Sequence, residues 1–390
     1  MFALIEKYHQ KLTDTPLDFI RDIHSKIEWE DRLVAILGGR GVGKSTLILQ
    51  HIKKFENPDE CLYVAADDLW FASNSIYNLA LSFYKNGGKK LFIDEIHKYK
   101  GWSNEIKNIY DDFPKLKVIY TGSSILDLQK GNADLSRRLL QYNMYGLSFR
   151  EYLLFAKGIE IPVHRLDEIL DNRITFPLDS YRPIPLFKEY LKEGYYPYFK
   201  ESSYFQRLSN VVNRVLEIDI PQATGITVSK VEKLKKLLYI IVQSVPFKPN
   251  YSKIAKDLNI SRNDIEDLMI WLEKSQLVNI LREEAKGIGL LGKVDKVFLA
   301  NTNLSFALAD NYPDIGNLRE TVFLSLMKVT HKVFSSNQSD FKVGEYTFEV
   351  GGKGKKQTQI RGLEKAFLVK DDIEYGMGNI RPLWAFGLLY

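Results

Sequence analysis

The stretch "ILGGRGVGKST", residues 36–46, contains the most specific local pattern of the chain. It overlaps a short apolar run, residues 32–37, that predicts a buried strand, and it leads into residues 45–54, whose apolar positions recur at helical spacing. Glycines between a strand and a helix let backbone N–H groups surround phosphate oxygens, and the helix N-terminus adds partial positive charge. The pattern G-x-x-x-x-G-K-S in this context therefore predicts a nucleotide-phosphate loop.

The residue types within this loop have distinct expected roles. Lys44 is expected to reach the β- and γ-phosphates, and the Ser45 hydroxyl is expected to bind Mg²⁺. The predicted nucleotide-binding residues are Gly38, Gly39, Arg40, Gly41, Val42, Gly43, Lys44, Ser45 and Thr46. The alternative is a glycine-rich turn without a ligand, and the strand before it and the helix after it disfavour that interpretation.

A second motif, "LFIDE", places two carboxylates directly after an apolar strand at residues 91–93. Carboxylates at the C-terminal end of a parallel strand face the ligand crevice. Asp94 is therefore expected to hold Mg²⁺ through water, and Glu95 to act as the base that polarises the attacking water. The alternative is an ordinary acidic helix start, and the presence of the phosphate loop favours the catalytic interpretation.

Two further strands complete the first part of the chain. Residues 61–65 and 117–120 are apolar and alternate with helical segments, so we expect an α/β fold with a parallel sheet and crossover helices. After the second of these strands, Ser123 is expected to hydrogen-bond the γ-phosphate or the attacking water. The alternative is that these hydroxyls are structural, with Ser124 capping the next helix.

A pair of arginines, Arg137 and Arg138, precedes the next strand-like run. An arginine beside the γ-phosphate stabilises transition-state charge and can come from a neighbouring subunit, which would require a homo-oligomer. The alternative is a solvated basic pair.

Composition sets the broad class. A chain of 390 residues predicts two to four domains. No apolar run approaches the roughly 18 residues that span a bilayer, so no membrane association is expected. The single cysteine, Cys61, favours a reducing cytoplasm. A net charge of +5 permits nucleic-acid binding without arguing for it.

Taken in order, the motifs GGRGVGKS, LFIDE, IYTGSS, LSRR and GLSFREYL resemble those of AAA+-type ATPases of bacteria and archaea that carry a C-terminal domain related to PD-(D/E)XK nucleases. The resemblance implies ATP and Mg²⁺, a sheet in the order 5-1-4-3-2, an α-helical lid and a winged helix before the tail. It places the family's arginine on Arg138, but Arg137 stands where the family has glycine, so either could act. Gly146 replaces the usual proline, which we expect to alter only a turn.

Residues 251–283 read as helix, tight turn, helix and strand, the pattern of a winged helix. Ser261 and Asp264 predict a capping box, and Ile265, Leu268 and Leu272 then share one face. The second helix carries two basic and four acidic residues, 2 − 4 = −2. Because phosphate contacts dominate DNA affinity, packing or dimerisation is favoured over DNA reading. The aromatic segment "GYYPYF", residues 194–199, either stacks on bases or packs in a core, and packing is favoured.

Residues 340–349 predict a β-hairpin whose two-residue loop begins with Gly344, as a type II′ turn requires. This register places Asp340 opposite Glu349, where two carboxylates repel unless a metal ion lies between them. Glu320 could be a third ligand of such a nuclease-like site.

Two features argue against cleavage at this hairpin. Gly351 stands where the nuclease pattern has lysine, and Lys353 and Lys355 are nearby but not at the matching position. The apolar residues also share one face, so Asp340 and Glu349 could lie on the solvated side of an ordinary hairpin. We predict a nuclease-derived fold without cleavage.

These inferences predict an N-terminal helical segment over 1–30, a P-loop ATPase core over 31–155, a helical lid and linker over 156–236, a winged helix over 237–284 and a nuclease-like α/β domain over 285–390. The predicted function is Mg²⁺-dependent ATP binding and slow hydrolysis that repositions the winged-helix and nuclease-like domains. The alternatives are an ATP-regulated, metal-dependent nuclease acting on DNA or RNA, and a nucleotide-sensing switch or scaffold with a protein partner.

Overall fold

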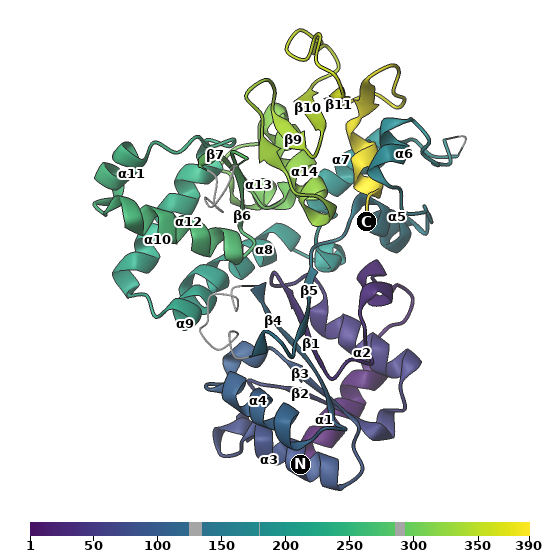
Figure 1. The fold of residues 1–390 in the computed structure, drawn as a ribbon, viewed down its shortest axis with the longest axis vertical. Helices are drawn as coiled ribbons and strands as arrows, with labels where there is room; N and C mark the ends of the chain where they lie inside the picture. Colours follow the sequence, from purple (N-terminus) through teal and green to yellow (C-terminus); the bar gives the residue numbers. More distant parts are fainter. Residues whose placement is uncertain (125–134, 179, 285–292) are drawn as a thin grey trace. The chain divides into compact units, whose positions relative to one another are not determined.

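The apolar runs around the phosphate loop form one five-stranded parallel sheet (Figure 1). A computed structural model describes residues 1–124, 135–178, 180–284 and 293–390. The strands are β1 (Leu33–Gly38), β2 (Cys61–Ala65), β3 (Lys90–Asp94), β4 (Lys117–Ser123) and β5 (Leu140–Met144). Their order is β2-β3-β4-β1-β5, which confirms the expected order 5-1-4-3-2.

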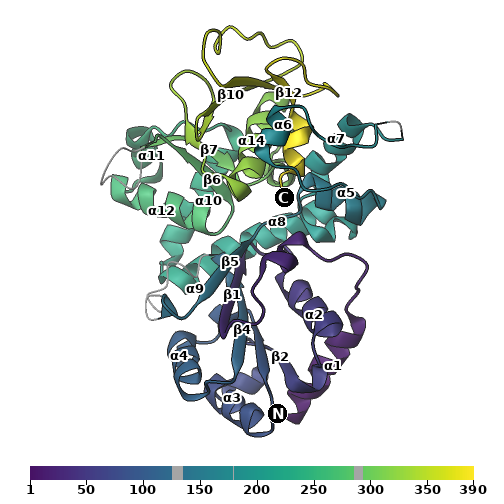
Figure 2. The same ribbon diagram turned by 45° about the vertical axis from the view of Figure 1, so that its right-hand side comes forward.

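Helices cover both faces of this sheet. They are α1 (Phe2–Asp14), α2 (Lys44–Phe55), α3 (Ile76–Lys85) and α4 (Trp102–Asp112). Figures 1 and 2 show α1 and α2 on one face and α3 and α4 on the other. Because β1 and β3 are covered on both sides, every one of their residues is buried, and the runs 33–37 and 91–93 within them are apolar rather than alternating.

Strand β4 is longer than its sequence indicated. The apolar run predicted a strand ending at Tyr120, but β4 continues to Ser123. It does so because it pairs with β1 from Val118 to Ser123, with Gly38 opposite Ser123. This register places the end of β4 beside the start of the phosphate loop.

The chain divides into two compact units, Met1–Tyr145 with Asp219–Gly225, and Gly146–Ile218 with Ile226–Tyr390. Helix α9 (Ile220–Thr224) belongs to the first unit. The helices of the second unit are α5 (Phe149–Lys157), α6 (Leu166–Leu170), α7 (Pro183–Glu193), α8 (Tyr204–Arg214), α10 (Val228–Gln243), α11 (Tyr251–Leu258), α12 (Arg262–Lys274), α13 (Thr302–Leu308) and α14 (Ile315–Thr330). The finer division predicted from the sequence stays a prediction.

The second unit also contains two sheets. The smaller one pairs β6 (Val278–Arg282) with β7 (Val294–Leu299) in antiparallel fashion. The larger one is mixed and has the order β12-β11-β10-β9-β8. Its strands are β8 (Phe334–Ser335), β9 (Phe341–Val343), β10 (Tyr346–Gly351), β11 (Ala366–Lys370) and β12 (Ile380–Pro382).

Helix α12 begins where the sequence predicts. The capping box of Ser261 and Asp264 is present, and the three predicted apolar residues after it are buried. Two of its four acidic residues are paired by other elements, because Lys230 Nζ lies 2.6 Å from Asp264 and Arg282 Nη2 lies 2.7 Å from Glu273. The net negative charge of the helix is thus offset inside its own unit.

The aromatic segment around Tyr195 packs in the interior. Tyr195 and Tyr196 are both buried, in agreement with packing rather than base stacking. A Cβ atom at Gly146 would lie 2.3 Å from a ring carbon of Tyr195. The expectation that glycine here alters only a turn is therefore wrong, because the absence of a side chain makes room for the tyrosine ring.

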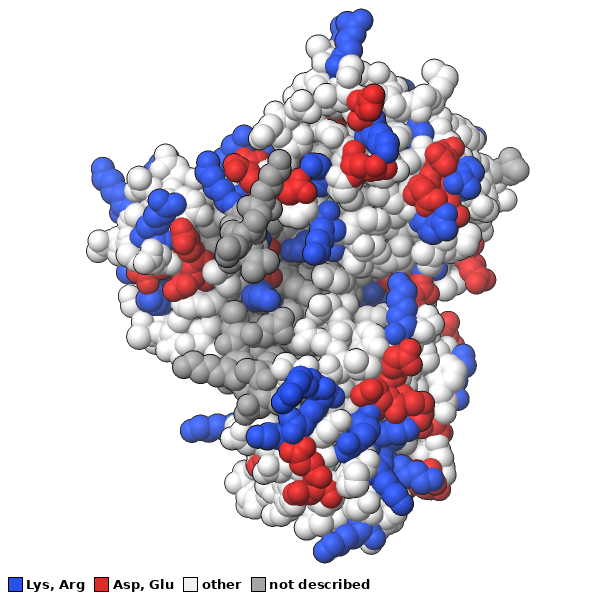
Figure 3. Space-filling view, viewed as in Figure 1, with Lys and Arg blue, Asp and Glu red and all other residues white. Residues whose placement is uncertain are grey.

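None of the helices within the described ranges is long and apolar enough to cross a membrane. On the face seen in Figure 3, positive and negative side chains of the described residues are interspersed over both units. An interspersed surface differs from the one-sided basic stripe that is typical of proteins that track a phosphate backbone.

Candidate nucleotide-binding site

The phosphate loop joins β1 to α2 and encloses the side chain of Lys44. Lys44 is 6% exposed, and its Nζ donates hydrogen bonds of 2.9 Å to the carbonyl oxygens of both Gly38 and Gly39. Burial in this position lowers the pKa of the ammonium group, while the carboxylates of Glu95 and Asp94 oppose that shift. The loop thus holds a buried cation at the end of β1, where the sequence placed the phosphate-binding lysine.

Glycine is required at three points of the loop. A Cβ atom at Gly38 would lie 2.3 Å from the backbone oxygen of Met144. Gly41 and Gly43 have φ angles of 82° and 98°, in the left-handed region that favours glycine. The glycine spacing of the motif is therefore set by backbone geometry and by the close approach of β5.

Asp94 ends β3 and lies among hydroxyl groups. Thr121 Oγ1 donates a short hydrogen bond to Asp94 Oδ1, and the Tyr63 hydroxyl donates to Asp94 Oδ2 at 2.6 Å. Burial and the negative charge of Asp94 raise the pKa of Tyr63, so Tyr63 stays a donor. Both donors come from neighbouring strands, β4 and β2, and they hold the Asp94 carboxylate in place.

Thr121 also supports Glu95, because its Oγ1 accepts a hydrogen bond of 3.0 Å from the backbone N–H of Glu95. Replacing this fully buried threonine with valine (Thr121→Val) preserves its shape and leaves that N–H without its acceptor. We expect the free energy of unfolding to fall by about 2 kcal/mol and ATP turnover to fall on the order of tenfold. Chemical denaturation and phosphate release measure the two effects. The exposed Thr13→Val variant is the control, and unchanged values in Thr121→Val would contradict this role for Thr121.

Glu95 has a strained backbone and a raised pKa. Its φ angle is 52°, which is uncommon for a residue other than glycine and clusters at functional sites. Burial raises the pKa of its carboxyl group, and the nearby charges of Lys44 and Arg40 oppose the shift. A carboxylate with a raised pKa close to a phosphate loop is suited to accept a proton from water.

His97 is a member of this site that the sequence did not predict. Its side chain is 4% exposed, with Nε2 at 3.7 Å from Glu95 Oε2, and burial lowers its pKa to about 4. Neither ring nitrogen has a hydrogen-bond partner among the described residues. An unsatisfied buried polar group in a native structure is a pointer to function. Its position two residues after Glu95 is the signal that could have identified it.

Arg21 fixes the loop from outside the motif. Its buried guanidinium donates to the Val42 carbonyl at 2.9 Å and to the Tyr145 carbonyl at 3.0 Å. It thereby connects the N-terminal segment, the phosphate loop and the residue after β5. No local sequence pattern indicates this role, because the contacts span 21 and 124 residues.

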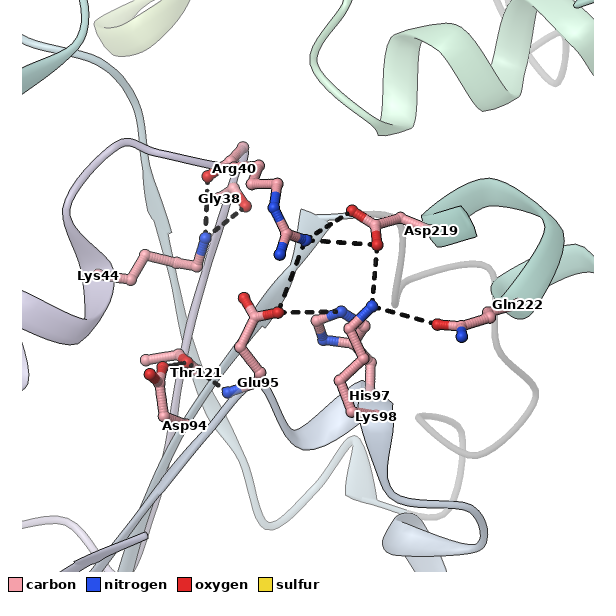
Figure 4. A network of polar contacts seen from close by, with 11 residues as sticks. Gly38, Arg40, Lys44, Asp94, Glu95, His97, Lys98, Thr121, Asp219 and Gln222 are labelled. Atoms are coloured by element: carbon pink, nitrogen blue, oxygen red, sulfur yellow. Dashed lines mark hydrogen bonds and ion pairs between the residues drawn. The ribbon is translucent and has the colours of Figure 1, made fainter. Parts of the chain in front are cut away.

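A third carboxylate reaches the site from residues 219–225 (Figure 4). Asp219 accepts hydrogen bonds from Arg40 Nη1 at 3.0 Å and from Lys98 Nζ at 2.9 Å. Arg40 Nη1 also lies 3.8 Å from Glu95 Oε2. No local sequence pattern indicates a role for Asp219 or Lys98 at this site.

The oxygen donors at this site fit Mg²⁺. The Ser45 side chain hydrogen-bonds to Tyr63, which in turn donates to Asp94, so Ser45 and Asp94 flank the same hydroxyl group. A hydroxyl and a carboxylate are ligand types that Mg²⁺ binds together with water and phosphate oxygens. Ser45 and Asp94 are thus the residues that would hold this ion.

The other predicted site residues lie as follows. Thr46 is exposed in the first turn of α2, and Ser123 lies on β4 opposite Gly38, two residues from Thr121 and therefore on the same face of the strand. Arg138 pairs with Asp111 of α4, with Nη2 3.1 Å from Oδ1. Arg137 is exposed. The roles of Ser123 and of the two arginines stay predictions.

The predicted hairpin forms, and its two carboxylates are not on a solvated face. Strands β9 and β10 pair in the predicted register, with Val343 opposite Tyr346. Glu349 is 1% exposed, so the alternative of a solvated hairpin side is wrong for this residue. Asp340 accepts a hydrogen bond from the Val350 N–H at 3.0 Å. The polar face of the hairpin is thus buried at Glu349 and half-buried at Asp340.

Two lysines neutralise the carboxylates of the tail. Lys296 Nζ lies 3.1 Å from Glu320 Oε2 and 3.3 Å from Asp340 Oδ1. Lys355 Nζ lies 2.5 Å from Glu349 Oε1. Burial raises the pKa of Glu349, and Lys355 opposes that shift. Among the described residues, no group of three or more His, Cys, Asp or Glu side chains is arranged to hold a metal ion.

Lys355 lies close to Gly351 in space. A Cβ atom at Gly351 would lie 2.5 Å from Lys355 Cγ, so the Lys355 side chain occupies the space that a side chain at position 351 would take. No lysine stands at the matching position in the sequence, but the Lys355 side chain occupies the corresponding space. The turn between the two residues brings the lysine back.

Comparisons with known proteins agree with this site. Residues 30–153 match a family described as an AAA domain, and residues 184–314 match a domain of unknown function, DUF8612. The uncharacterized protein MJ1637 of Methanocaldococcus jannaschii is 26% identical over 300 residues, which cover 70% of this chain and 62% of that protein. The chain thus spans about three fifths of that relative's length.

Three solved structures show weak likeness to the chain. A structure on katanin self-assembly has a TM-score of 0.26 and 14% identity, covering 40% of this chain and 57% of that one. The structure of a DNA replication initiation factor has a TM-score of 0.25 and 12% identity, and the match covers 70% of this chain and 94% of that one. The structure of AMPPCP-bound DnaA from Aquifex aeolicus has a TM-score of 0.27 and 15% identity, and the match covers 69% of this chain and 86% of that one. TM-scores this low say nothing about function.

The family match and the geometry of the loop agree on the first part of the chain. The match covers β1 to β5, and the loop within it has the buried lysine, the positive-φ glycines and the paired acidic residues of an ATPase site. The chain contains an AAA-type P-loop ATPase domain, which implies nucleotide binding.

Proposed function

We propose that this protein binds Mg·ATP at the C-terminal ends of β1, β3 and β4 and hydrolyses it. The observation that carries the proposal is the convergence of a buried lysine, two acidic residues and supporting hydroxyls from three neighbouring strands. Lys44 supplies the phosphate-binding cation, Ser45 and Asp94 supply oxygen ligands for Mg²⁺, and Glu95 supplies the base. When bound by these residues, Mg²⁺ would supply positive charge to the phosphate oxygens.

The residues of this chain would act as follows. Lys44 Nζ would exchange its two carbonyl acceptors for phosphate oxygens. A charged phosphate oxygen forms a stronger hydrogen bond with the ammonium group than a neutral carbonyl does. Glu95 takes a proton from the attacking water, whose oxygen forms the new bond to the γ-phosphorus while the bond to the β–γ bridging oxygen breaks. The hydrogen bonds of Thr121 would hold the Asp94 carboxylate and the Glu95 backbone in position during this step.

The experiment that tests the proposal is phosphate release from Mg·ATP, measured with and without mixed DNA and RNA. Turnover that disappears in the Lys44→Ala variant supports an ATPase. Tight ATP binding with no turnover in the wild-type protein would instead identify a nucleotide-sensing switch or scaffold. Stimulation by nucleic acid would name its partner class, and indifference to nucleic acid would favour a protein-directed ATPase.

We also propose that the nucleotide state is coupled to the arrangement of the other domains. ATP state would reposition a helical lid, a winged helix built from α11, α12, β6 and β7, and the nuclease-like tail. The order of those elements supports it, since two helices are followed by an antiparallel strand pair. An arginine delivered by a neighbouring subunit would make unaided turnover slow, and Arg138 beside β5 is its predicted source.

A second candidate function, metal-dependent cleavage of DNA or RNA, is supported by the position of Lys355. Nucleases of the pattern D…E-x-K use the lysine to position water next to the glutamate. Lys355 takes the place of a side chain at residue 351 and contacts Glu349, and Asp340 accepts a hydrogen bond from the residue that follows Glu349. The Lys296 ammonium between Glu320 and Asp340 opposes this function, because it already neutralises those carboxylates.

Glu349 provides the test of the second candidate. If the wild-type protein cuts mixed DNA or RNA with Mg²⁺ or Mn²⁺, the Glu349→Gln variant is expected to lose that cleavage by about a hundredfold or more. Burial raises the pKa of Glu349 above 4.5, so its ionised form opposes folding increasingly as the pH rises past that value, and the variant should unfold at no lower temperature at pH 7. Glu345→Ala, at an exposed residue of the same hairpin, is the control. Absence of cleavage by the wild-type protein rejects this candidate.

A further inference from the structure

Residues 219–225 form the part of the P-loop unit that comes from far along the chain. Their neighbours in sequence on both sides, Ile218 and Ile226, belong to the other unit. The segment consists of Asp219 and the single turn of α9 with its following glycine. A short segment that belongs to the nucleotide-binding unit but is continuous with the other unit at both ends needs specific contacts to hold it there.

Asp219 makes the strongest of these contacts. Its side chain is 3% exposed, and its carboxylate lies between Arg40 Nη1 and Lys98 Nζ. Burial alone would raise the pKa of Asp219, but the hydrogen bond from Lys98 and the charges of Lys98 and Arg40 hold it below its usual value. Gln222 adds a second contact, because its Oε1 lies 3.2 Å from Lys98 Nζ. A carboxylate this buried is stable only while its cations stay in place.

Arg40 lies between two carboxylates. Its Nη1 is 3.0 Å from Asp219 Oδ2 and 3.8 Å from Glu95 Oε2, as Figure 4 shows. Glu95 is the group that would polarise water in line with the γ-phosphate, so a guanidinium within 4 Å of it lies at the γ-phosphate end of the site. A guanidinium has five N–H donors. Its contacts with carboxylates among the described residues use Nη1, and its other donors are suited to phosphate oxygens.

The charges of this site balance. Lys44, Arg40 and Lys98 contribute three positive charges, while Asp94, Glu95 and Asp219 contribute three negative charges, 3 − 3 = 0. The negative Asp219 therefore competes with the phosphates for Arg40 and Lys98. Asp219 therefore weakens the attraction of this site for phosphate, while its contacts fix the position of the Arg40 guanidinium. We infer that its role is to orient Arg40 and not to increase nucleotide affinity.

From these contacts we propose that Arg40 supplies, from the same subunit, the positive charge that contacts the γ-phosphate, and that Asp219 is the positioning residue that aims it. This inference rests on the proposed ATPase function. It differs from the arginine-in-trans prediction, because it requires no neighbouring subunit for the second cation. Because Asp219 is held by Arg40, the contact of residues 219–225 with the phosphate loop would also depend on whether Arg40 binds a phosphate.

The kinetic signature of the proposal separates kcat from KM. Asp219→Asn keeps the shape of the side chain and removes its charge, so Arg40 loses its alignment while the phosphates lose a competitor. We expect kcat to fall about tenfold to a hundredfold and KM to stay level or fall. Asp219→Glu restores the charge and should recover part of kcat. Glu217→Gln, at an exposed residue two positions earlier, is the control.

A double-mutant cycle tests whether Asp219 acts through Arg40. In an Arg40→Ala background, Asp219→Asn should lower kcat no further, whereas effects that multiply would overturn the proposal. An unchanged kcat in Asp219→Asn would also overturn it.

Turnover per subunit should be independent of protein concentration and survive Arg138→Ala, and loss of turnover in that variant or on dilution would favour the arginine in trans. Thermal unfolding of each variant shows whether it is folded.

Nucleotide binding decides the proposal even if the wild-type protein has no turnover. In that case the ATPase function fails, and titration calorimetry compares ADP with a non-hydrolysable ATP analogue. Arg40→Ala should weaken binding of the analogue about tenfold more than binding of ADP, because only the analogue carries the γ-phosphate. Equal losses for the two nucleotides would overturn the assignment of Arg40.

Discussion

Replacing Lys44 with alanine is expected to abolish Mg·ATP binding at this site and all turnover that depends on it. The Lys44 ammonium is the buried cation of the loop, and its two present partners are the neutral carbonyls of Gly38 and Gly39. The other cation of the loop, Arg40, is more exposed and is already paired with Asp219. Removing one preorganised charged donor from such a site costs at least about a hundredfold in rate.

The Lys44→Ala experiment is informative because the variant should fold. Burial lowers the pKa of Lys44, which means that the charged ammonium is held at a cost to the empty protein. Alanine removes that cost, so we expect no drop in the unfolding temperature without nucleotide. Titration calorimetry and phosphate release measure binding and turnover, with the exposed Lys54→Ala variant at the end of α2 as control. A folded Lys44→Ala protein with wild-type turnover would rule out this site as the ATPase centre.

The second large effect is expected for Glu95→Gln. Glutamine keeps the size of the side chain and cannot accept a proton from water, so turnover should fall by about 10²–10⁴-fold. Binding of Mg·ATP should be retained or strengthened, because a negative charge near the phosphates disappears. Initial rates of phosphate release and equilibrium titration with ATP measure the two quantities.

The pH dependence of both proteins follows from the raised pKa of Glu95. Glu95 acts as a base only when ionised, so the acid limb of the wild-type rate profile should lie above 4.5, the ordinary glutamate value. A group whose pKa is higher in the folded state costs stability as the pH rises past its unfolded value. Glu95→Gln should therefore unfold at a higher temperature than the wild-type protein at pH 7, and the exposed Glu60→Gln variant should not. Undiminished turnover in Glu95→Gln would remove Glu95 from the mechanism.

Local sequence patterns predicted the phosphate loop and the elements that carry it. The glycine spacing before Lys44 reports a backbone requirement, because Gly41 and Gly43 have positive φ angles and Gly38 touches β5. The buried strands were recognisable as uninterrupted apolar runs, since parallel strands covered on both faces have no polar side. The hairpin register at Gly344 followed from turn geometry.

Ends of elements were predicted less well when tertiary pairing extended them. Strand β4 runs to Ser123 because β1 lies beside it, and the residues after Tyr120 have no apolar pattern to announce it. The sequence pattern likewise did not indicate that Glu349 is buried. A hairpin sequence with apolar residues on one face looks the same whether its other face meets water or another part of the fold.

The sequence by itself determined the glycine-rich loop between β1 and α2 and the acidic end of β3, because these features are built from one continuous loop and one strand end. Only the tertiary structure decided what supports those residues. Thr121 and Tyr63 hold Asp94 from neighbouring strands, and Asp219 holds Arg40 across 179 positions of the chain. Such partners carry no local signal, because an ion pair or hydrogen bond depends on distance in space and its two members are free to lie anywhere in the sequence.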